Sequence, residues 1–279
     1  MTFNWDTSEE EIALYLTVLA ERKEEEENPL GISRTKPAND LPFMSHILEQ
    51  CSTQIDSSHF EHERLDESIK LFSKVRASEE AIAKAIFDEA RHSNHIENIY
   101  DEDQDEALAT LLTHIWNTPF DKLSLELISE FDKSIANRGI RKRGKGKVRI
   151  ANKGRVVFTP PDNCKKIMEL LEDWLSPRTP SNQSKICVHL GVSHYQFESI
   201  HPFYDGNGRI GRALLLCYFR HLTGATMIPA ISKHIYKNKQ DYYSSLNAPR
   251  FRGDFIELCS FIQNIFQDGI AESYCYLSS

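Results

Sequence analysis

The chain has 279 residues, and its 33 Lys and Arg against 41 Asp and Glu give a formal net charge of −8. Its composition, 40% hydrophobic and 27% charged, is typical of a globular protein and excludes a fully disordered one. The longest unbroken apolar run, Ala213–Phe219, is far shorter than the roughly 20 residues that cross a bilayer. We therefore expect one globular core of about 150–200 residues with an appendage, and no membrane association.

The first residues and the cysteines bear on the cellular compartment. Met1–Asp6 holds no basic region followed by an apolar stretch, which a signal peptide would need. The six cysteines contain no CxxC pair and lack the spacing of a zinc site. We expect reduced, mostly buried thiols and a cytoplasmic protein.

Helical patterns dominate the N-terminal part of the chain. Ser8 and Glu11 form a capping box, and the apolar residues behind them fall at helical spacing. This helix continues through the acidic run Glu24–Glu27 and ends before a proline-rich segment at 28–42. The next helical patterns lie at 43–56, 64–76 and 78–92. We expect residues 1–92 to form an N-terminal helical arm.

The rest of the chain, residues 93–279, is predicted to be a mainly α core with one β-hairpin. Two short β-prone runs, Val148–Ile150 and Arg155–Phe158, flank the turn residues Asn152-Lys153-Gly154 and predict the hairpin. A further helix is expected to open at Pro160. The other predicted helices lie at 102–116, 121–136, 182–197, 208–222, 238–247 and 253–268.

A basic stretch precedes and enters this hairpin. Between Arg138 and Arg155 there are nine Lys and Arg and no acidic residue. Three interpretations stay open: a solvated loop, steering of ATP or of an acidic target, and nucleic-acid binding. No aromatic residue interrupts the stretch to stack on bases, so nucleic-acid binding is the least favoured.

The most informative segment is residues 201–212, which read HPFYDGNGRIGR. Pro202 disfavours a helical backbone at His201, so a helix ends there. Gly206 and Gly208 permit backbone angles that other residues resist, and a buried helix follows. A glycine-rich loop that leads into a helix directs several N–H donors toward one point. The pattern predicts an anion site, and phosphate is the usual occupant.

The side chains of this segment suit a phosphate ligand. Arg209 and Arg212 lie three residues apart, and a guanidinium binds phosphate in a bidentate manner. Asp205 offers a hard oxygen ligand for Mg²⁺ beside that site, and His201 titrates near neutrality, as a general base should. The chain has neither a P-loop pattern nor a GxGxxG after a strand.

These residues resemble the Fic family motif HPFx(D/E)GNGRxxR at every specified position. Residues 194–200, the hairpin that ends at Thr159-Pro160-Pro161, and residues 241–246 resemble the family's lead-in, flap and tyrosine-bearing segment. The resemblance covers roughly residues 95–270. It implies a Fic-like helical bundle with a β-hairpin flap, here with an N-terminal helical extension.

The resemblance also implies a protein adenylyltransferase, a nucleotidyltransferase that moves AMP from ATP to a Ser, Thr or Tyr hydroxyl of a target protein, or of itself. Pyrophosphate would be released. His201 would take the proton from the hydroxyl, and Asp205 would hold Mg²⁺. Gly206, Asn207, Gly208 and Arg209 would cradle the phosphates. Arg212 would bind the γ-phosphate.

Two further sets of residues receive roles through the same resemblance. Tyr242 and Tyr243 would contact the base, although Pro249 is expected to shorten the helix that carries them. The flap would line up the target by strand addition, an edge-pairing mode. Its residues are Arg155, Val156, Val157 and Phe158.

A second motif lies N-terminal to the first. Residues 93–98, SNHIEN, match the pattern (S/T)xxxE(G/N), which resembles the inhibitory motif of many Fic proteins. Its position before the catalytic motif is that of class II members. The resemblance implies that Glu97, in a motif begun by Ser93, pairs with Arg212 and occupies the place of the γ-phosphate. The alternative is that Glu97 is an ordinary solvated or structurally paired carboxylate.

Several alternatives stay open at this point. The same site suits a phosphodiesterase that removes AMP from a modified protein, with Glu97 positioning a water. A non-catalytic nucleotide-binding module is the third function. The arm of residues 1–92 suits target recognition, homodimerisation or presentation of Glu97.

Overall fold

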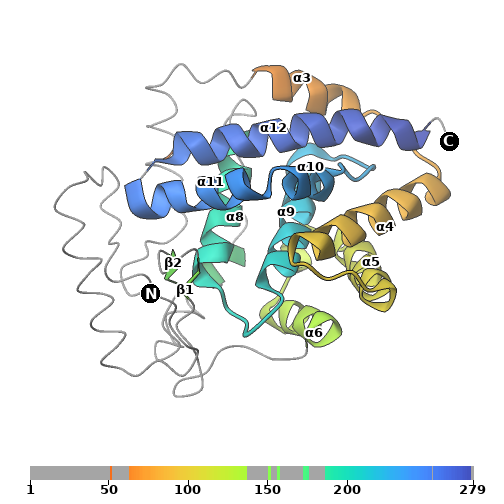
Figure 1. Cartoon of the computed structure of the whole chain (residues 1–279). Helices are drawn as coiled ribbons and strands as arrows, with labels where there is room; N and C mark the ends of the chain where they lie inside the picture. Colours follow the sequence, from red (N-terminus) through yellow and green to blue (C-terminus); the bar gives the residue numbers. More distant parts are fainter. Residues whose placement is uncertain are drawn as a thin grey trace, which may run out of the picture.

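The computed structural model of the chain describes residue 51 and residues 63–136, 150–151, 156–157, 172–175, 186–252 and 254–277. Within these ranges it is a bundle of helices with one short pair of strands, which confirms the mainly α fold class (Figure 1). The elements in chain order are α3 (Glu63–Phe72), α4 (Glu79–Ile96), α5 (Glu102–Asn117), the 3₁₀ helix η2 (Phe120–Lys122), α6 (Leu125–Ile135), β1 (Ile150–Ala151), β2 (Val156–Val157), α8 (Ile186–Ile200), α9 (Asn207–Thr223), α10 (Ile231–Lys237), α11 (Lys239–Arg252), α12 (Phe255–Ser273) and the 3₁₀ helix η4 (Tyr274–Leu277).

Helix α9 lies at the centre of the bundle. Every residue of its apolar run Ala213–Phe219 is buried, as expected of a helix that is apolar on all sides. Helices α5 and α8 pack against α9, and α12 lies across α8 with α11 beside it (Figure 1). Glycines in the left-handed backbone region, Gly206 (φ 79°) and Gly224 (φ 68°), mark the two ends of α9.

Side-chain caps fix where several other helices begin. The side chains of Ser78, Asp101, Ser124 and Asp254 accept hydrogen bonds from backbone N–H groups in the first turns of α4, α5, α6 and α12. Each cap satisfies a donor that has no partner inside the helix. These short polar residues explain why the helix starts lie close to the positions that the sequence predicts.

The sequence predictions differ from the structure at several helices: α3 ends at Phe72 rather than at 76, and α12 continues to Ser273 rather than ending at 268. The short helix α10 was not predicted. Helix α11 continues through Pro249, so the expectation that this proline shortens the helix was wrong. Ala248 and Leu246 beside it are buried, and α11 packs along α12. This tertiary packing outweighs the backbone hydrogen bond that proline cannot donate.

The predicted hairpin region contains one antiparallel strand pair. Ile150 pairs with Val157 and Ala151 with Val156. The flap residues Arg155 and Phe158, and the basic stretch from 138 to 149, lie outside the described residues. Of the helix expected after Pro160, residues 172–175 are described and are helical, and Trp174 among them is buried.

The division of the chain at residue 92 stays a prediction, because most of residues 1–62 lie outside the described part. The structure adds that this boundary falls inside α4, which runs without interruption from Glu79 to Ile96. Helix α4 packs on α5 and α10, and α3 packs on α12. The end of the predicted arm therefore joins the same hydrophobic core as the rest of the described helices.

Two general features concern thiols and membranes. Of the five cysteines in the described ranges, four are buried and Cys275 is exposed, and all five are free thiols. Among the described helices, none combines the length and apolar character needed to span a bilayer.

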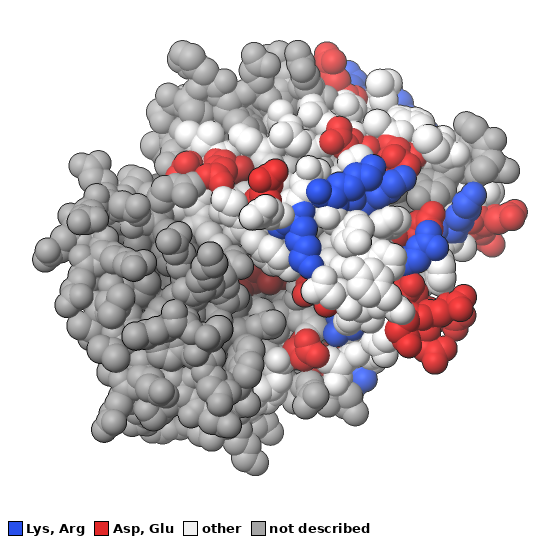
Figure 2. Space-filling view, viewed as in Figure 1, with Lys and Arg blue, Asp and Glu red and all other residues white. Residues whose placement is uncertain are grey.

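Charge is mixed over the face that Figure 2 shows. Lys and Arg side chains form a strip near the centre of the view, and separate groups of Asp and Glu lie to either side. Acidic and basic side chains thus alternate on this face, so the net charge of −8 does not describe any local surface.

A buried carboxylate joins α4 to α10. Glu89 is 2% exposed, and its two oxygens accept hydrogen bonds from the backbone N–H of Ser232 at 3.0 and 2.9 Å. Ser232 lies in the first turn of α10, which has no side-chain cap of its own. Burial raises the pKa of Glu89 from 4.5 to about 7, although the bonds from Ser232 oppose the shift.

This raised pKa predicts a pH-dependent contribution to stability. Because the pKa of Glu89 is higher in the folded protein, its contribution is fully present below about pH 4.5 and is lost as pH rises through about 7. The loss is on the order of 2–3 kcal/mol. We expect Glu89→Gln to lack this loss of stability with rising pH, because the glutamine amide does not titrate. Urea unfolding of both proteins at pH 5 to 8 measures the difference, and a constant difference across this range would contradict the assignment.

Candidate active site

The site is built where α8 ends and α9 begins. His201 is the first residue after α8, and its N–H still donates to the carbonyl of Phe197 at 2.9 Å. Its φ of 49° lies in the left-handed region, which is uncommon for a residue other than glycine. Pro202 disfavours the right-handed helical alternative. Such strained backbone is concentrated at functional sites, which fits the predicted role of His201.

Asn207 holds the loop in shape. Its Oδ1 accepts from the N–H of Phe203 at 2.9 Å, and its Nδ2 donates to the carbonyl of Phe203 at 2.8 Å. Both Asn207 and Phe203 are buried, so Phe203 anchors the loop in the core. Both polar atoms of the Asn207 side chain are therefore used to fix the loop. Asn207 can offer a ligand only its backbone N–H.

The first turn of α9 forms one wall of the site. The N–H groups in the first turn of a helix have no partner inside the helix, and the helix dipole adds partial positive charge there. Gly206 has φ 79° and allows the chain to enter α9 from the loop. Asp205 is exposed, and its Oδ1 accepts from the N–H of Gly206 at 2.7 Å. This end of α9 can bind an anion such as phosphate.

Arg209 adds a buried cation. It is 3% exposed, and its Nη1 donates to Gln104 Oε1 on α5 at 3.4 Å. Within the described ranges its Nε makes no hydrogen bond. Burial lowers the pKa of Arg209, while Asp205 and Glu97 oppose the shift. A buried guanidinium with a spare donor suits an anionic ligand.

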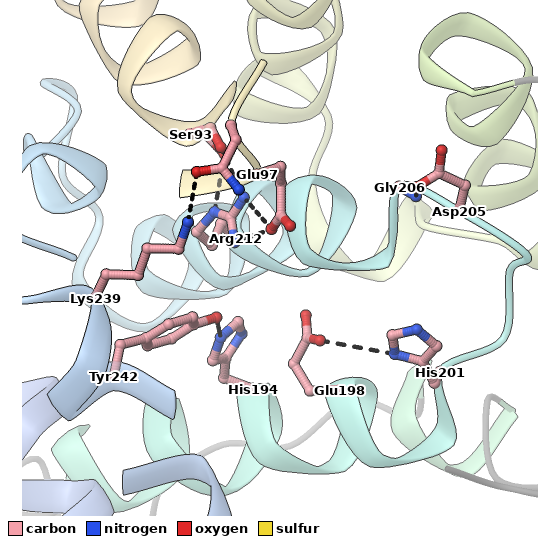
Figure 3. A network of polar contacts seen from close by, with 11 residues as sticks. Ser93, Glu97, His194, Glu198, His201, Asp205, Gly206, Arg212, Lys239 and Tyr242 are labelled. Carbon is pink, nitrogen blue, oxygen red and sulfur yellow. Dashed lines mark hydrogen bonds and ion pairs between the residues drawn. The ribbon is translucent and has the colours of Figure 1, made fainter. Parts of the chain in front are cut away.

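Arg212 is the most completely engaged residue of the site. Arg212 is 1% exposed, and its guanidinium donates hydrogen bonds to Ser93 in α4 and to Glu97 at the C-terminal end of α4 (Figure 3). Nε donates to Ser93 Oγ and Nη2 to the carbonyl of Ser93, both at 2.9 Å. Nη1 and Nη2 both donate to Glu97 Oε1 at 3.1 Å. The predicted pairing of Glu97 with Arg212 is therefore present.

Electrostatics explain why this cation keeps its charge. Burial alone would lower the pKa of Arg212, but Glu97 and the other acidic groups near it raise that pKa above its ordinary value. The Glu97 side chain is 32% exposed and lies at the edge of the site. Arg212 is thus a permanent buried cation, neutralised from the solvent side by Glu97.

Gly208 lies directly beneath this ion pair. A Cβ built on Gly208 would lie 2.4 Å from Glu97 Oε1 and 2.9 Å from Arg212 Nη1. The carboxylate therefore sits against the backbone of the first turn of α9, where an anionic ligand would bind. Glu97 thus lies between the Arg212 guanidinium and the backbone at Gly208.

Asn98, the residue after Glu97, stands at the last position of the motif (S/T)xxxE(G/N), and its backbone conformation explains why that position is Gly or Asn. Asn98 has φ 60°, a left-handed conformation that asparagine and glycine tolerate best. It lets the chain turn back after α4, so that the N–H of Ile99 donates to the carbonyl of Asn94 at 3.1 Å. Lys239 at the start of α11 donates to Asn98 Oδ1 at 3.1 Å. The end of α4 is thus fixed from both sides.

The two tyrosines predicted to contact the base lie differently. Tyr242 is 1% exposed, and its hydroxyl lies 2.7 Å from His194 Nε2 on α8. Burial, with a smaller effect of Arg212, lowers the pKa of His194 to about 3, so this imidazole is neutral. The burial of Tyr242 argues against a base contact. Tyr243 is half-buried, and its contact with a base stays a prediction.

Two contacts were missed by sequence reasoning. Glu198 Oε2 lies 3.9 Å from His201 Nδ1, and Gln104 contacts Arg209 across α5 and α9. The i, i+3 spacing of Glu198 and His201 at one helix end was a signal for the first contact. The second joins residues 105 positions apart, and no local pattern indicates it.

Part of the chain is similar to known proteins of one family. Residues 122–219 match the Fic/DOC family. The protein adenylyltransferase Fic of Nematostella vectensis is 36% identical over 87 residues, which cover 31% of this chain and 19% of that protein. The protein adenylyltransferase fic-1 of Caenorhabditis elegans is 26% identical over 145 residues, 51% of this chain and 27% of that protein. The chain thus spans about a fifth to a quarter of the length of these curated relatives.

The fold has solved counterparts. The structure of Fic-1 residues 134–508 from C. elegans is similar with a TM-score of 0.60 at 15% identity, covering 96% of this chain and 84% of that one. A structure of the same segment with a single glutamate-to-glycine substitution gives a TM-score of 0.57 at 15% identity, covering 99% and 95%. At this identity the likeness shows a shared helical fold.

The contacts of Arg212 predict a stability effect. We expect Ser93→Ala to lower the unfolding free energy by about 1–3 kcal/mol, because Arg212 Nε would lose a buried acceptor. That corresponds to a fall in Tm of several degrees. The matched control is Ser134→Ala, an exposed serine whose hydroxyl donates to the carbonyl of Glu130 in its own helix. An equal change in the two variants, measured by thermal unfolding, would show that Ser93 does not hold Arg212.

Proposed function

We propose that the chain, whose residues 122–219 match the Fic/DOC family, transfers the AMP part of ATP to a hydroxyl of a target protein. The acceptor is a Ser, Thr or Tyr of the target, or of the chain itself, and the second product is pyrophosphate. The observation that carries this proposal is the convergence of His201, the first turn of α9 and two buried arginines around one junction of α8 and α9. This set offers a base and an anion cradle, and those are what the reaction needs.

In the proposed reaction, residues of the site account for the proton that moves and for the charge on the phosphates. The acceptor hydroxyl gives its proton to the imidazole of His201, and its oxygen forms a bond to the α-phosphorus of ATP. The bond from the α-phosphorus to the bridging oxygen breaks, and pyrophosphate leaves. The first turn of α9 and the cation of Arg209 stabilise the negative charge on the phosphates. Arg212 would bind the γ-phosphate once the Glu97 carboxylate no longer occupies the Arg212 guanidinium.

The metal proposed for this reaction is Mg²⁺ held by Asp205. Within the described ranges there is no cluster of three or more His, Cys, Asp or Glu side chains that could form a complete metal cage. A Mg²⁺ ion that binds together with nucleotide phosphates needs only one or two carboxylates, and the exposed Asp205 at the mouth of α9 fits that donor set. When bound, the ion supplies charge neutralisation at the phosphates.

We also propose that Glu97 inhibits this activity. Its carboxylate uses the two terminal nitrogens of Arg212 and lies against Gly208. ATP cannot place an anionic γ-phosphate on the same donors while Glu97 is there. Ser93 keeps Arg212 in position even without Glu97, because it accepts from Nε and from Nη2. Removal of Glu97 should therefore leave a cation that is already aligned for phosphate.

The strand pair and the arm complete the proposal. The edge of β2, with Val156 and Val157, would align the target segment by strand addition. For the N-terminal arm we propose to test target recognition and homodimerisation beside the presentation of Glu97, a role that the packing of α4 in the core supports.

The test of the function is the labelling of proteins by ATP carrying an α-phosphate radiolabel. We expect Glu97→Gly to label proteins at least several-fold faster than the wild type, because Arg212 becomes available to the γ-phosphate. The matched control is Glu102→Gly, which removes an exposed carboxylate at the start of α5 and should change nothing. Adding His201→Ala to Glu97→Gly should abolish the labelling.

Two outcomes would overturn parts of this account. If folded Glu97→Gly labels no faster than the wild type, the inhibitory role is wrong. If labelling survives His201→Ala, the proposed base is wrong. If Glu97→Gly binds ATP but labels no protein, a non-catalytic nucleotide-binding module is favoured. The partly exposed Glu97 above Gly208 also suits a carboxylate that positions a water. Release of AMP from a labelled protein by the wild type, but not by Glu97→Gly, would indicate a phosphodiesterase at the same site.

A further inference from the structure

Glu198 is a carboxylate of the site to which the proposed function assigns no role. It lies in the last turn of α8, three residues before His201, which is the first residue after that helix. Its Oε2 lies 3.9 Å from His201 Nδ1, a distance at which a carboxylate and an imidazolium attract one another (Figure 3). The Glu198 and His201 side chains are 12% and 8% exposed.

The Glu198 carboxylate is held in place from the opposite side by α9. A Cβ built on Gly211 would lie 2.3 Å from Glu198 Oε1 and 3.1 Å from Phe197 Cδ1. A side chain at position 211 would displace the Glu198 carboxylate from this position between the two helices. Glu198 therefore has little freedom to turn away from His201.

Glu198 also interacts electrostatically with Arg212 of α9. Arg212 lies on the facing side of α9, and Glu198 is one of the groups that raise the pKa of this arginine. A carboxylate that is mostly buried needs such a partner to stay charged. The Glu198 carboxylate thus lies near both the Arg212 cation and the His201 imidazole.

We infer that Glu198 is a positioning residue that sets the tautomer and orientation of the His201 imidazole. A carboxylate near Nδ1 favours the tautomer with the proton on Nδ1 and leaves Nε2 bare to act as the base. The inference rests on the proposed transfer reaction. In that reaction the proton of the acceptor hydroxyl moves to Nε2, the Nδ1 proton stays in place, and Glu198 remains ionised. The carboxylate stabilises the imidazolium that forms.

This role differs from that of Glu97, although both carboxylates lie near Arg212. Glu97 is at the solvent edge and competes with the ligand for the arginine. Glu198 comes from α8, lies beside the base and is packed against Gly211 of α9. Removing Glu97 should therefore raise activity, whereas removing the charge of Glu198 should lower it.

The test uses the full chain in the Glu97→Gly background, where transfer can be measured. We expect Glu198→Gln to reduce kcat by roughly 10- to 100-fold, the range for partners that orient a functional histidine. The Kd for ATP should stay within about twofold, since Glu198 is not part of the phosphate cradle. The matched control is Glu130→Gln, an exposed glutamate on α6, which should leave kcat unchanged. If Glu198→Gln does not fold, Glu198→Asp provides the same comparison, because its shorter side chain keeps the carboxylate but moves it away from His201.

A spectroscopic measurement makes the inference independent of activity. Nitrogen-15 labelling of histidines, with His201 assigned from the signals lost in His201→Gln, reports which ring nitrogen carries the proton. We expect a bare Nε2 in the protein with Glu198, and a shift toward the other tautomer in Glu198→Gln. An unchanged tautomer together with an unchanged kcat would overturn the role of Glu198. Equal losses in kcat and in ATP affinity would show that it only maintains the shape of the site.

The failure of this inference can be told apart from the failure of the proposed function. If His201→Ala in the same background retains full transfer, the proposed base is wrong whatever Glu198 does. If His201→Ala abolishes transfer while Glu198→Gln retains it, the transfer reaction stands and the positioning role is rejected.

Discussion

The buried guanidinium of Arg212 is the constraint around which the site is organised. A fully buried cation is costly unless its donors and its charge are matched, and here both needs are met by α4 and the residue that ends it. Ser93 accepts from Nε and Nη2, and Glu97 accepts from both terminal nitrogens. The pairing therefore joins α9, the central helix of the bundle, to a helix that lies more than a hundred residues away in the sequence.

Helix α4 is suited to this task because one of its faces makes three contacts in succession. Glu89, Ser93 and Glu97 follow one another at intervals of four residues, so they lie along one side of the helix. The first contacts α10, and the other two contact Arg212. Because Glu89 and Ser93 are buried while Glu97 is partly exposed, the inner contacts can persist when the outer one is replaced by a ligand. The proposed inhibition thus needs only a local change at the end of α4.

Sequence reasoning went furthest where local chemistry determines structure. Pro202, Gly206 and the apolar run of α9 predict the loop and the buried helix, and both are found. The burial of Tyr242 could not be predicted, because it depends on His194 of α8, 48 residues away. Pro249 was misjudged for a similar reason, since packing on α12 decides whether the helix continues. Glu198 had a local signal, but its position against α9 is a property of the packed helices alone.

The central claim is that Glu97 occupies the place of the γ-phosphate on Arg212. Calorimetric titration of ATP and of ADP, each with Mg²⁺, into the wild type and into Glu97→Gly tests it most directly, because the two ligands differ in that phosphate alone. The account predicts that the substitution strengthens ATP binding about tenfold or more relative to ADP binding, as expected for a charge-assisted bond to a buried arginine. An ATP-to-ADP affinity ratio that is the same in both proteins would contradict it.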